Sequence, residues 1–193
     1  MSERRGEVIR KTKETDINIS LDLDGGEVAI DSGIGFLDHM LTAFGVHGGF
    51  GLNVRCKGDL EVDGHHTAED IGIALGQAFA QAIGDKKGIA RYGSFYIPMD
   101  EALAFCSLDI SGRPFLVFDA QFPQWRCGEF DCCLTEEFFR AFAMNSGVTL
   151  HIKSMYGNNS HHIIEAIFKA VAHALKAACK IEYEGTLSTK GIL

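Results

Sequence analysis

The chain of 193 residues repeats itself, and this internal repeat restricts its fold more than any other feature. The string His65-His66-Thr67-Ala68-Glu69 of the first half returns as His161-His162-Ile163-Ile164-Glu165 in the second. The match extends to further pairs, which include Glu14/Glu101, Ser20/Ser107, Gly25/Gly112, Phe44/Phe142, Gly49/Gly147, Leu52/Leu150 and Val54/Ile152. We therefore expect two copies of one folding unit that bury their apolar faces together.

Hydrophobic periodicity predicts the same elements in each half. Apolar residues alternate near 16–23, 27–31 and 52–57, and again near 103–110, 115–120 and 149–154, which predicts strands. Helical spacing predicts helices near 36–46 and 67–83, and near 134–145 and 163–179. Residues 1–92 and 93–193 are thus predicted to be two βββαα halves of one integrated domain. The fold class expected is α+β, a two-layer α/β sandwich made by internal duplication.

Composition excludes several classes of protein. With 46% apolar residues the chain can bury a core, and a formal net charge of -8 argues against a nucleic-acid-binding surface. No apolar run approaches the length of a membrane span and the first residues are charged, so we expect no membrane partner and a cytoplasmic location. The six cysteines form no Cys-x-x-Cys pair and are predicted to be reduced packing residues.

The two repeated strings offer metal ligands. On a helix, residues four apart share a face, so His65 projects with Glu69 and His161 with Glu165. Imidazole and carboxylate together suit first-row divalent metals, and adjacent histidines can serve two ions. One string has too few ligands for a closed site, so the pattern predicts that both strings build one dinuclear site.

The register of the repeat adds one ligand from each half, because His39 aligns with Glu137. A solvated helix face is an equally good interpretation of Glu137. The full set then has eight members, enough for two ions with positions left for a substrate: His39, His65, His66, Glu69, Glu137, His161, His162 and Glu165.

Other segments carry groups that bind phosphate. Arg91, Arg113 and the run Ser188-Thr189-Lys190 place cations and hydroxyls in glycine-containing loops. The sequence does not show that these loops converge. The string Asp22-Leu23-Asp24-Gly25 is typical of a phosphatase family, but its copy at 109–112 lacks the second aspartate, which indicates a strand end and turn.

These motifs together resemble the imidazoleglycerol-phosphate dehydratases of histidine biosynthesis. The resemblance rests on Phe36-Leu37-Asp38-His39-Met40, both His-His strings, Ser111-Gly112-Arg113-Pro114 and Ser188-Thr189-Lys190-Gly191, and it spans about Arg10 to Leu193. It implies a manganese-dependent lyase that dehydrates D-erythro-imidazole glycerol phosphate to imidazole acetol phosphate. It also implies two Mn²⁺ per active site and a homo-oligomer of 24 subunits with sites between subunits.

The resemblance also assigns residues. It implies one ion on His39, His66, Glu69 and His161, and the other on His65, His162 and Glu165, with Glu137 at a position where the family often has histidine. Substrate contacts would fall on the metal-site residues His39, His65, Glu69 and His161 and on Glu14, His47, Arg91, Arg113, Lys169, Ser188, Thr189 and Lys190. The phosphate itself would be held by Arg91, Arg113, Ser188 and Lys190.

The proton to be lost lies on a carbon attached to the imidazole ring, where it is weakly acidic. Two metal ions on the ring nitrogens would stabilise an imidazolate intermediate, while Glu14, Glu69 or Glu165 moves protons. Sequence alone does not choose among these carboxylates, and intrinsic affinity would favour zinc over manganese. A dinuclear metallohydrolase and a metal-storing assembly without turnover stay open as alternatives.

Overall fold

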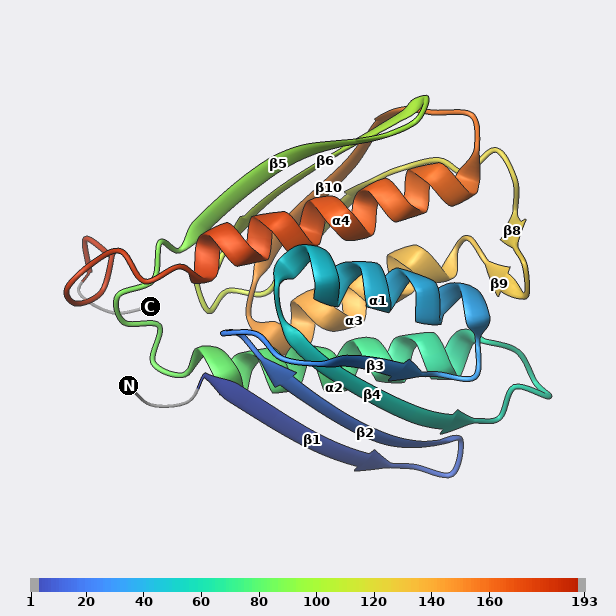
Figure 1. Ribbon diagram of the computed structural model, residues 1–193, viewed down its shortest axis with the longest axis horizontal. Coiled ribbons are helices and arrows are strands. Elements are labelled where there is room, and N and C mark those ends of the chain that lie inside the picture. Colours follow the sequence, from blue (N-terminus) through green and yellow to red (C-terminus); the bar gives the residue numbers. More distant parts are fainter. Residues whose placement is uncertain (1–3, 191–193) are drawn as a thin grey trace.

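Two four-stranded sheets form the outer faces of the molecule and four helices fill the space between them (Figure 1). The computed structural model describes residues 4–190. Its first half contains β1 (Arg5–Lys11), β2 (Thr15–Asp22), β3 (Val28–Asp31), α1 (Gly35–Gly48), β4 (Gly51–Gly58) and α2 (His65–Ile83). Its second half contains β5 (Tyr92–Met99), β6 (Ala102–Asp109), β7 (Phe115–Asp119), β8 (Arg126–Cys127), β9 (Phe130–Asp131), α3 (Leu134–Ser146), β10 (Thr149–Tyr156) and α4 (Ser160–Cys179).

The two sheets have the same topology, and the fold is the duplicated α+β type that the sequence predicts. Their strand orders are β1-β2-β4-β3 and β5-β6-β10-β7. In each sheet the last two strands of the order run parallel and the other neighbours antiparallel. Each half therefore forms a four-stranded sheet, which has one strand more than the predicted βββαα unit, and one of its helices precedes the last strand of that sheet.

Two strands missing from the prediction, β1 and β5, each contain a glycine at the point where they cross a helix. A Cβ on Gly6 would lie 1.9 Å from the carbonyl oxygen of Ala78 in α2, and one on Gly93 would lie 1.9 Å from that of Ala174 in α4. Only glycine allows the two backbones to approach this closely. The glycine interrupts the alternation of apolar side chains, so periodicity did not reveal these strands.

The helices join the two halves through one core. Helix α2 packs on β1 and β2 of its own sheet and along α3 of the other half, while α4 packs on β5 and β6 and along α1. The buried side chains form a single cluster with members from both halves. Each half is thus a sheet covered by helices, and stacking the halves places α1 beside α4.

All four helices begin at the same end of the molecule, on the right of Figure 1, where β8 and β9 also lie. Helices α1 and α3 both end at a glycine in the left-handed conformation, Gly49 with φ 66° and Gly147 with φ 72°. The shared direction of the four helices gathers the two His-His strings at one end of the molecule.

The six cysteines are free thiols, five of them buried, as packing residues are expected to be.

Candidate active site

The same local turn presents both His-His strings. The side chain of Asp63 accepts a hydrogen bond from the backbone N–H of His65 at 2.8 Å, and Asn159 accepts one from that of His161 at 2.9 Å. Aspartate and asparagine favour such turns at helix starts because their oxygens satisfy a free N–H group. Each turn thus places a first histidine on the opening turn of α2 or α4.

Side chains from the two halves meet at the start of α1 and α4. Within residues 4–190, His39, His161 and Glu165 are the one group of three such side chains whose ligand atoms all lie within 4.8 Å of one another. The Nε2 atoms of His39 and His161 lie 3.4 and 3.3 Å from Oε2 of Glu165. We call these three residues the α1–α4 trio. Two imidazoles and a carboxylate suit a first-row divalent ion.

Glu165 is the buried member of the trio, with a side chain 8% exposed. Burial alone would raise its pKa, but the hydrogen bond and charge of Lys169, with a smaller contribution from His39, leave the pKa below its ordinary value. Lys169 Nζ lies 2.6 Å from Oε1, one turn further along α4. The carboxylate is therefore held ionised, the form that binds a metal.

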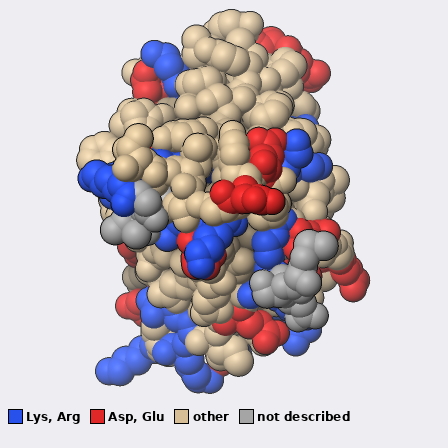
Figure 2. Space-filling view, turned by 90° about the vertical axis from the view of Figure 1, so that its left-hand side faces the viewer, with Lys and Arg blue, Asp and Glu red and all other residues tan. Residues whose placement is uncertain are grey.

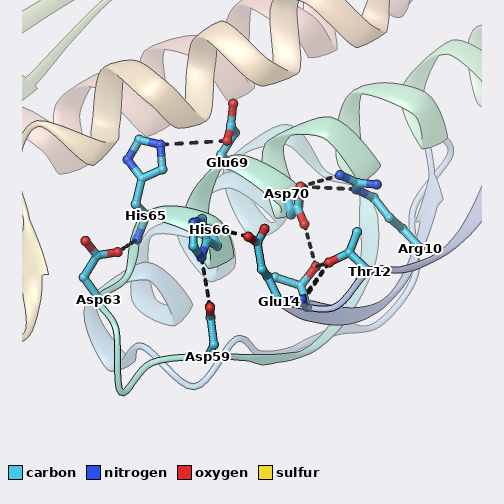
Figure 3. A network of polar contacts seen from close by, with 10 residues as sticks. Arg10, Thr12, Glu14, Asp59, Asp63, His65, His66, Glu69 and Asp70 are labelled. Atoms are coloured by element: carbon cyan, nitrogen blue, oxygen red, sulfur yellow. Dashed lines mark hydrogen bonds and ion pairs between the residues drawn. The ribbon is translucent and has the colours of Figure 1, made fainter.

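The equivalent residues of the first half are more open. His65 Nε2 lies 3.8 Å from Oε2 of Glu69, whose side chain is 45% exposed (Figure 3). Glu137, the counterpart of His39, lies 3.9 Å from Arg140 on its own helix and does not complete a compact trio in the described residues. The structure thus brings His65 and Glu69 together and leaves Glu137 paired with a cation.

The second histidine of each string contacts carboxylates. His66 Nδ1 lies 3.0 Å from Asp59, and His162 Nδ1 lies 2.6 Å from Glu101. The hydrogen bonds raise the pKa of both histidines, and the bond to His162 lowers the pKa of Glu101 to about 2. A carboxylate on one ring nitrogen orients the other toward a metal. Sequence reasoning missed Asp59 and Glu101, although the repeat aligns Glu101 with Glu14.

Glu14 lies beside the first His-His string. Its carboxylate is 3.8 Å from His66 Nε2 and its side chain is 53% exposed (Figure 3). The turn that carries Glu14 is anchored by buried Asp70, which accepts hydrogen bonds from Thr15 at 2.5 Å and Arg10 at 2.6 Å. Asp70 directly follows Glu69, so the residue after the string positions Glu14, a role that sequence reasoning did not assign.

The loops that are predicted to bind phosphate converge on one pocket of about 770 Å³. It is lined by Arg91, Tyr92, Arg113, Thr186, Leu187, Ser188, Thr189 and Lys190. Arg91 donates to both carboxylate oxygens of Asp109, at 2.7 and 3.0 Å, and to the carbonyl of Leu187 at 2.7 Å. The hydrogen bond to Asp109 raises the pKa of Arg91, which stays charged. The structure thus supplies the convergence that the sequence left open.

We call this pocket the phosphate pocket, after the contacts that the resemblance implies. The phosphate pocket and the α1–α4 trio lie at opposite ends of α4. The backbone N–H of Arg91 binds the carbonyl of Ala178 at 2.9 Å, whereas His161 is on the first turn of the helix. At 1.5 Å per residue the two points are about 25 Å apart. Figure 2 looks onto the pocket end, where lysine and arginine side chains gather near the centre beside acidic ones.

The remaining predicted contacts, His47 and Lys169, lie between these ends on the seam of α1 and α4. His47 Nδ1 lies 3.3 Å from Nε2 of His173. Burial, followed by the nearby charge of Lys169, lowers the pKa of His47. The seam therefore carries a line of basic groups that starts at the trio.

Comparisons with known proteins agree with this geometry. The family model for imidazoleglycerol-phosphate dehydratase matches residues 32–175. Dehydratases of that name from Acetivibrio thermocellus and Thermoanaerobacter pseudethanolicus are 56% and 58% identical, over 99% and 98% of this chain and all of theirs. The Staphylococcus aureus crystal structure has a TM-score of 0.83 at 47% identity, covering 90% of this chain and 97% of its own. The Pyrococcus furiosus enzyme, solved in complex with (S)-C348, has a TM-score of 0.85 at 40% identity, covering 96% and 100%.

The fold and these relatives define the chain as a lyase of histidine biosynthesis. The chain belongs to the imidazoleglycerol-phosphate dehydratase family. This membership decides against a metallohydrolase and against an assembly without turnover. None of the helices in residues 4–190 has the length and apolar character needed to cross a bilayer.

Proposed function

We propose that the chain dehydrates D-erythro-imidazole glycerol phosphate to imidazole acetol phosphate at a site that holds two Mn²⁺ ions. The observation that carries this proposal is the α1–α4 trio, in which residues of both halves gather two imidazoles and a carboxylate. The donor set fits the metal, because nitrogen and carboxylate ligands suit first-row divalent ions. We also propose that the enzyme acts in the cytoplasm.

The trio supports a grouping of ligands that differs from the one the resemblance implies. Glu165 lies with His39 and His161, whereas the resemblance allots it to the other ion. By the repeat, Glu69 would then serve the second ion with His65 and Glu137. His66 and His162, oriented by Asp59 and Glu101, would complete the two ligand sets.

When bound, the two ions would supply positive charge at the ring nitrogens and so stabilise an imidazolate. Among the three candidate bases, Glu165 is buried, and its carboxylate already contacts His39, His161 and Lys169. Glu69 faces His65, while Glu14 is half-exposed beside His66. We therefore assign proton removal to Glu14 and place Glu69 and Glu165 among the metal ligands.

The positions of the two subsites support a site shared between subunits. The substrate is one imidazole ring, a three-carbon chain and a phosphate, far shorter than the roughly 25 Å of α4 that separates the trio from the phosphate pocket. One subunit would supply the metal ligands with His47 and Lys169. Another would supply the phosphate contacts Arg91, Arg113, Ser188 and Lys190 with the neighbouring substrate contact Thr189, within an assembly of 24 copies.

Two measurements test this proposal. Manganese-loaded protein is incubated with imidazole glycerol phosphate and the ketone product is followed, while light scattering gives the mass of the assembly. We expect turnover that EDTA abolishes and Mn²⁺ restores, in a particle of 24 chains. Fully assembled, metal-loaded protein that forms no ketone would refute the proposed reaction, and an active monomer would refute the shared site.

A further inference from the structure

His47 and His173 form a pair of histidines on the seam of α1 and α4, outside the proposed metal ligands. The Nδ1 atom of His47 and the Nε2 atom of His173 are 3.3 Å apart, and both rings are half-buried. Phe95 of β5 stacks on His173 with ring centroids 5.4 Å apart and planes at 29°. The stack restricts rotation of the His173 ring, so its Nε2 atom stays directed at His47.

Two neutral imidazoles at this distance share one hydrogen bond, and its direction fixes the chemistry of the free nitrogen. If His47 donates from Nδ1, its Nε2 carries a lone pair, which repels an anion. If His173 donates from Nε2, the Nε2 atom of His47 carries the proton and can donate it to an anion. The partner of His47 therefore decides whether the free nitrogen of His47 donates or accepts a hydrogen bond.

The surroundings keep both rings neutral. Burial and the ammonium group of Lys169 lower the pKa of His47, against a smaller opposing effect of Glu165, and burial with Lys176 lowers the pKa of His173. These charged groups all project from α4, and the contact from β5 is the apolar ring of Phe95. A neutral imidazole contributes to anion binding through an N–H group, so the tautomer of His47 is decisive.

We propose that His173 is a positioning residue that donates its Nε2–H to Nδ1 of His47 and so holds His47 as an Nε2–H donor to the substrate. The inference deepens the proposed function and rests on it, because it takes His47 to contact the substrate. His173 itself needs no contact with the substrate, and its effect falls on binding of the ground state rather than on the chemical step.

Kinetics of the manganese-loaded assembly test the role. His173→Leu keeps an apolar contact for Phe95 but removes the donor, and we expect KM to rise about tenfold with kcat within about twofold, equivalent to one lost hydrogen bond. His173→Gln places an amide N–H near the same position and should recover most of the affinity. His151→Leu, on the exposed side of β10, is the matched control and should leave KM unchanged. An unchanged KM in a folded His173→Leu protein would overturn the proposal.

A double-mutant cycle separates this role from general packing. In a His47→Ala background, His173→Leu should raise KM no further, because the group it positions is gone. Independent effects of the two substitutions would assign His173 a role that does not pass through His47.

The tautomer is measured directly by solid-state ¹⁵N NMR of histidine-labelled protein loaded with diamagnetic Zn²⁺. We expect a protonated Nε2 on His47 in the wild type, together with an Nδ1 signal whose shift shows an accepted hydrogen bond, and we expect that hydrogen-bond shift to be lost in His173→Leu. A protonated Nδ1 in the wild type would refute the proposal even if the enzyme is active. Absence of turnover by the wild type would instead refute the proposed function. The NMR result would still show whether His173 donates a hydrogen bond to His47.

Discussion

The two His-His strings have nearly the same sequence and the same backbone setting, yet they differ in how far they are assembled within one chain. In the second, Glu165 is buried and contacts two histidines, whereas in the first Glu69 is 45% exposed and, within residues 4–190, pairs with His65 alone. The charged neighbours explain the difference. Lys169 binds Glu165 one turn along α4, and the equivalent residue of α2 is Ile73. Duplication thus conserves the positions of the histidines and glutamates in the two strings. The charged residues around each string decide which of these side chains come into contact.

The largest effect is expected from removing the better assembled carboxylate. Glu165→Gln should reduce turnover by three orders of magnitude or more, on the scale of losing a principal catalytic group, because the α1–α4 trio loses the anionic group that we propose as a metal ligand. Glu69→Gln is the matched change in the other half and should weaken metal binding less, since Glu69 is more exposed. Metal content per chain and kcat measure both. Equal losses of metal in the two variants would show that the difference between the strings has no functional consequence.

The two aligned glutamates, Glu14 and Glu101, give the next largest contrast. Glu14→Gln should lower kcat by about 10²–10⁴-fold with metal content intact, as expected for a general base. Glu101→Gln should instead weaken Mn²⁺ affinity about 10–100-fold, because Glu101 orients His162. Steady-state kinetics and metal titration separate the two. A Glu14→Gln enzyme with full activity would remove Glu14 from the mechanism.

Arg113 and Arg4 test whether phosphate is bound by the second half alone. Arg113 is exposed and lines the phosphate pocket, so Arg113→Ala should raise KM about tenfold without unfolding the protein. Arg4 occupies the position equivalent to Arg91 but pairs with Asp24. Arg4→Ala should leave KM unchanged, and an increase similar to that of Arg113→Ala would mean that both halves bind phosphate.

Glu137 occupies the proposed ligand position where the halves differ in residue type. Glu137→Ala should weaken one of the two Mn²⁺ sites about tenfold, while Arg140→Ala should strengthen it slightly, because Arg140 lies 3.9 Å from the Glu137 carboxylate. Calorimetric titration with Mn²⁺ resolves the two sites. Unchanged binding in Glu137→Ala would leave Glu137 as a residue of the solvated helix face.

The smallest expected effect concerns the Arg4–Asp24 pair of the first half. The hydrogen bond and charge of Arg4 lower the pKa of Asp24 from its ordinary 3.8. A lowered carboxylate pKa stabilises the fold above pH 3.8, and this contribution is lost as the pH falls below it. Because Asp24 is exposed, Asp24→Asn should cost less than about 1 kcal/mol at neutral pH and nothing in strong acid. Thermal unfolding across this pH range measures it, and a constant difference would contradict the assignment.

The predicted helices and six of the strands agree with the structure to within three residues at each end. Their side chains alternate or recur on one face, and burial against the other half requires that pattern. Strands β1 and β5 were missed because Gly6 and Gly93 are selected by contact with helices distant in the sequence. Hairpin β8–β9 was missed because two residues per strand are too few for a period.

The sequence by itself determined the duplication, the two His-His-x-x-Glu strings on helix openings and the pairing of His39 with Glu137 in register. These depend on local periodicity and on comparison of one half with the other. Only the tertiary structure decided that Glu165 joins His39 and His161, that Asp59 and Glu101 orient the second histidines, and that the phosphate loops meet at the far end of α4. These contacts connect residues distant in the chain, and their geometry is set by packing of the two halves, which no local pattern encodes.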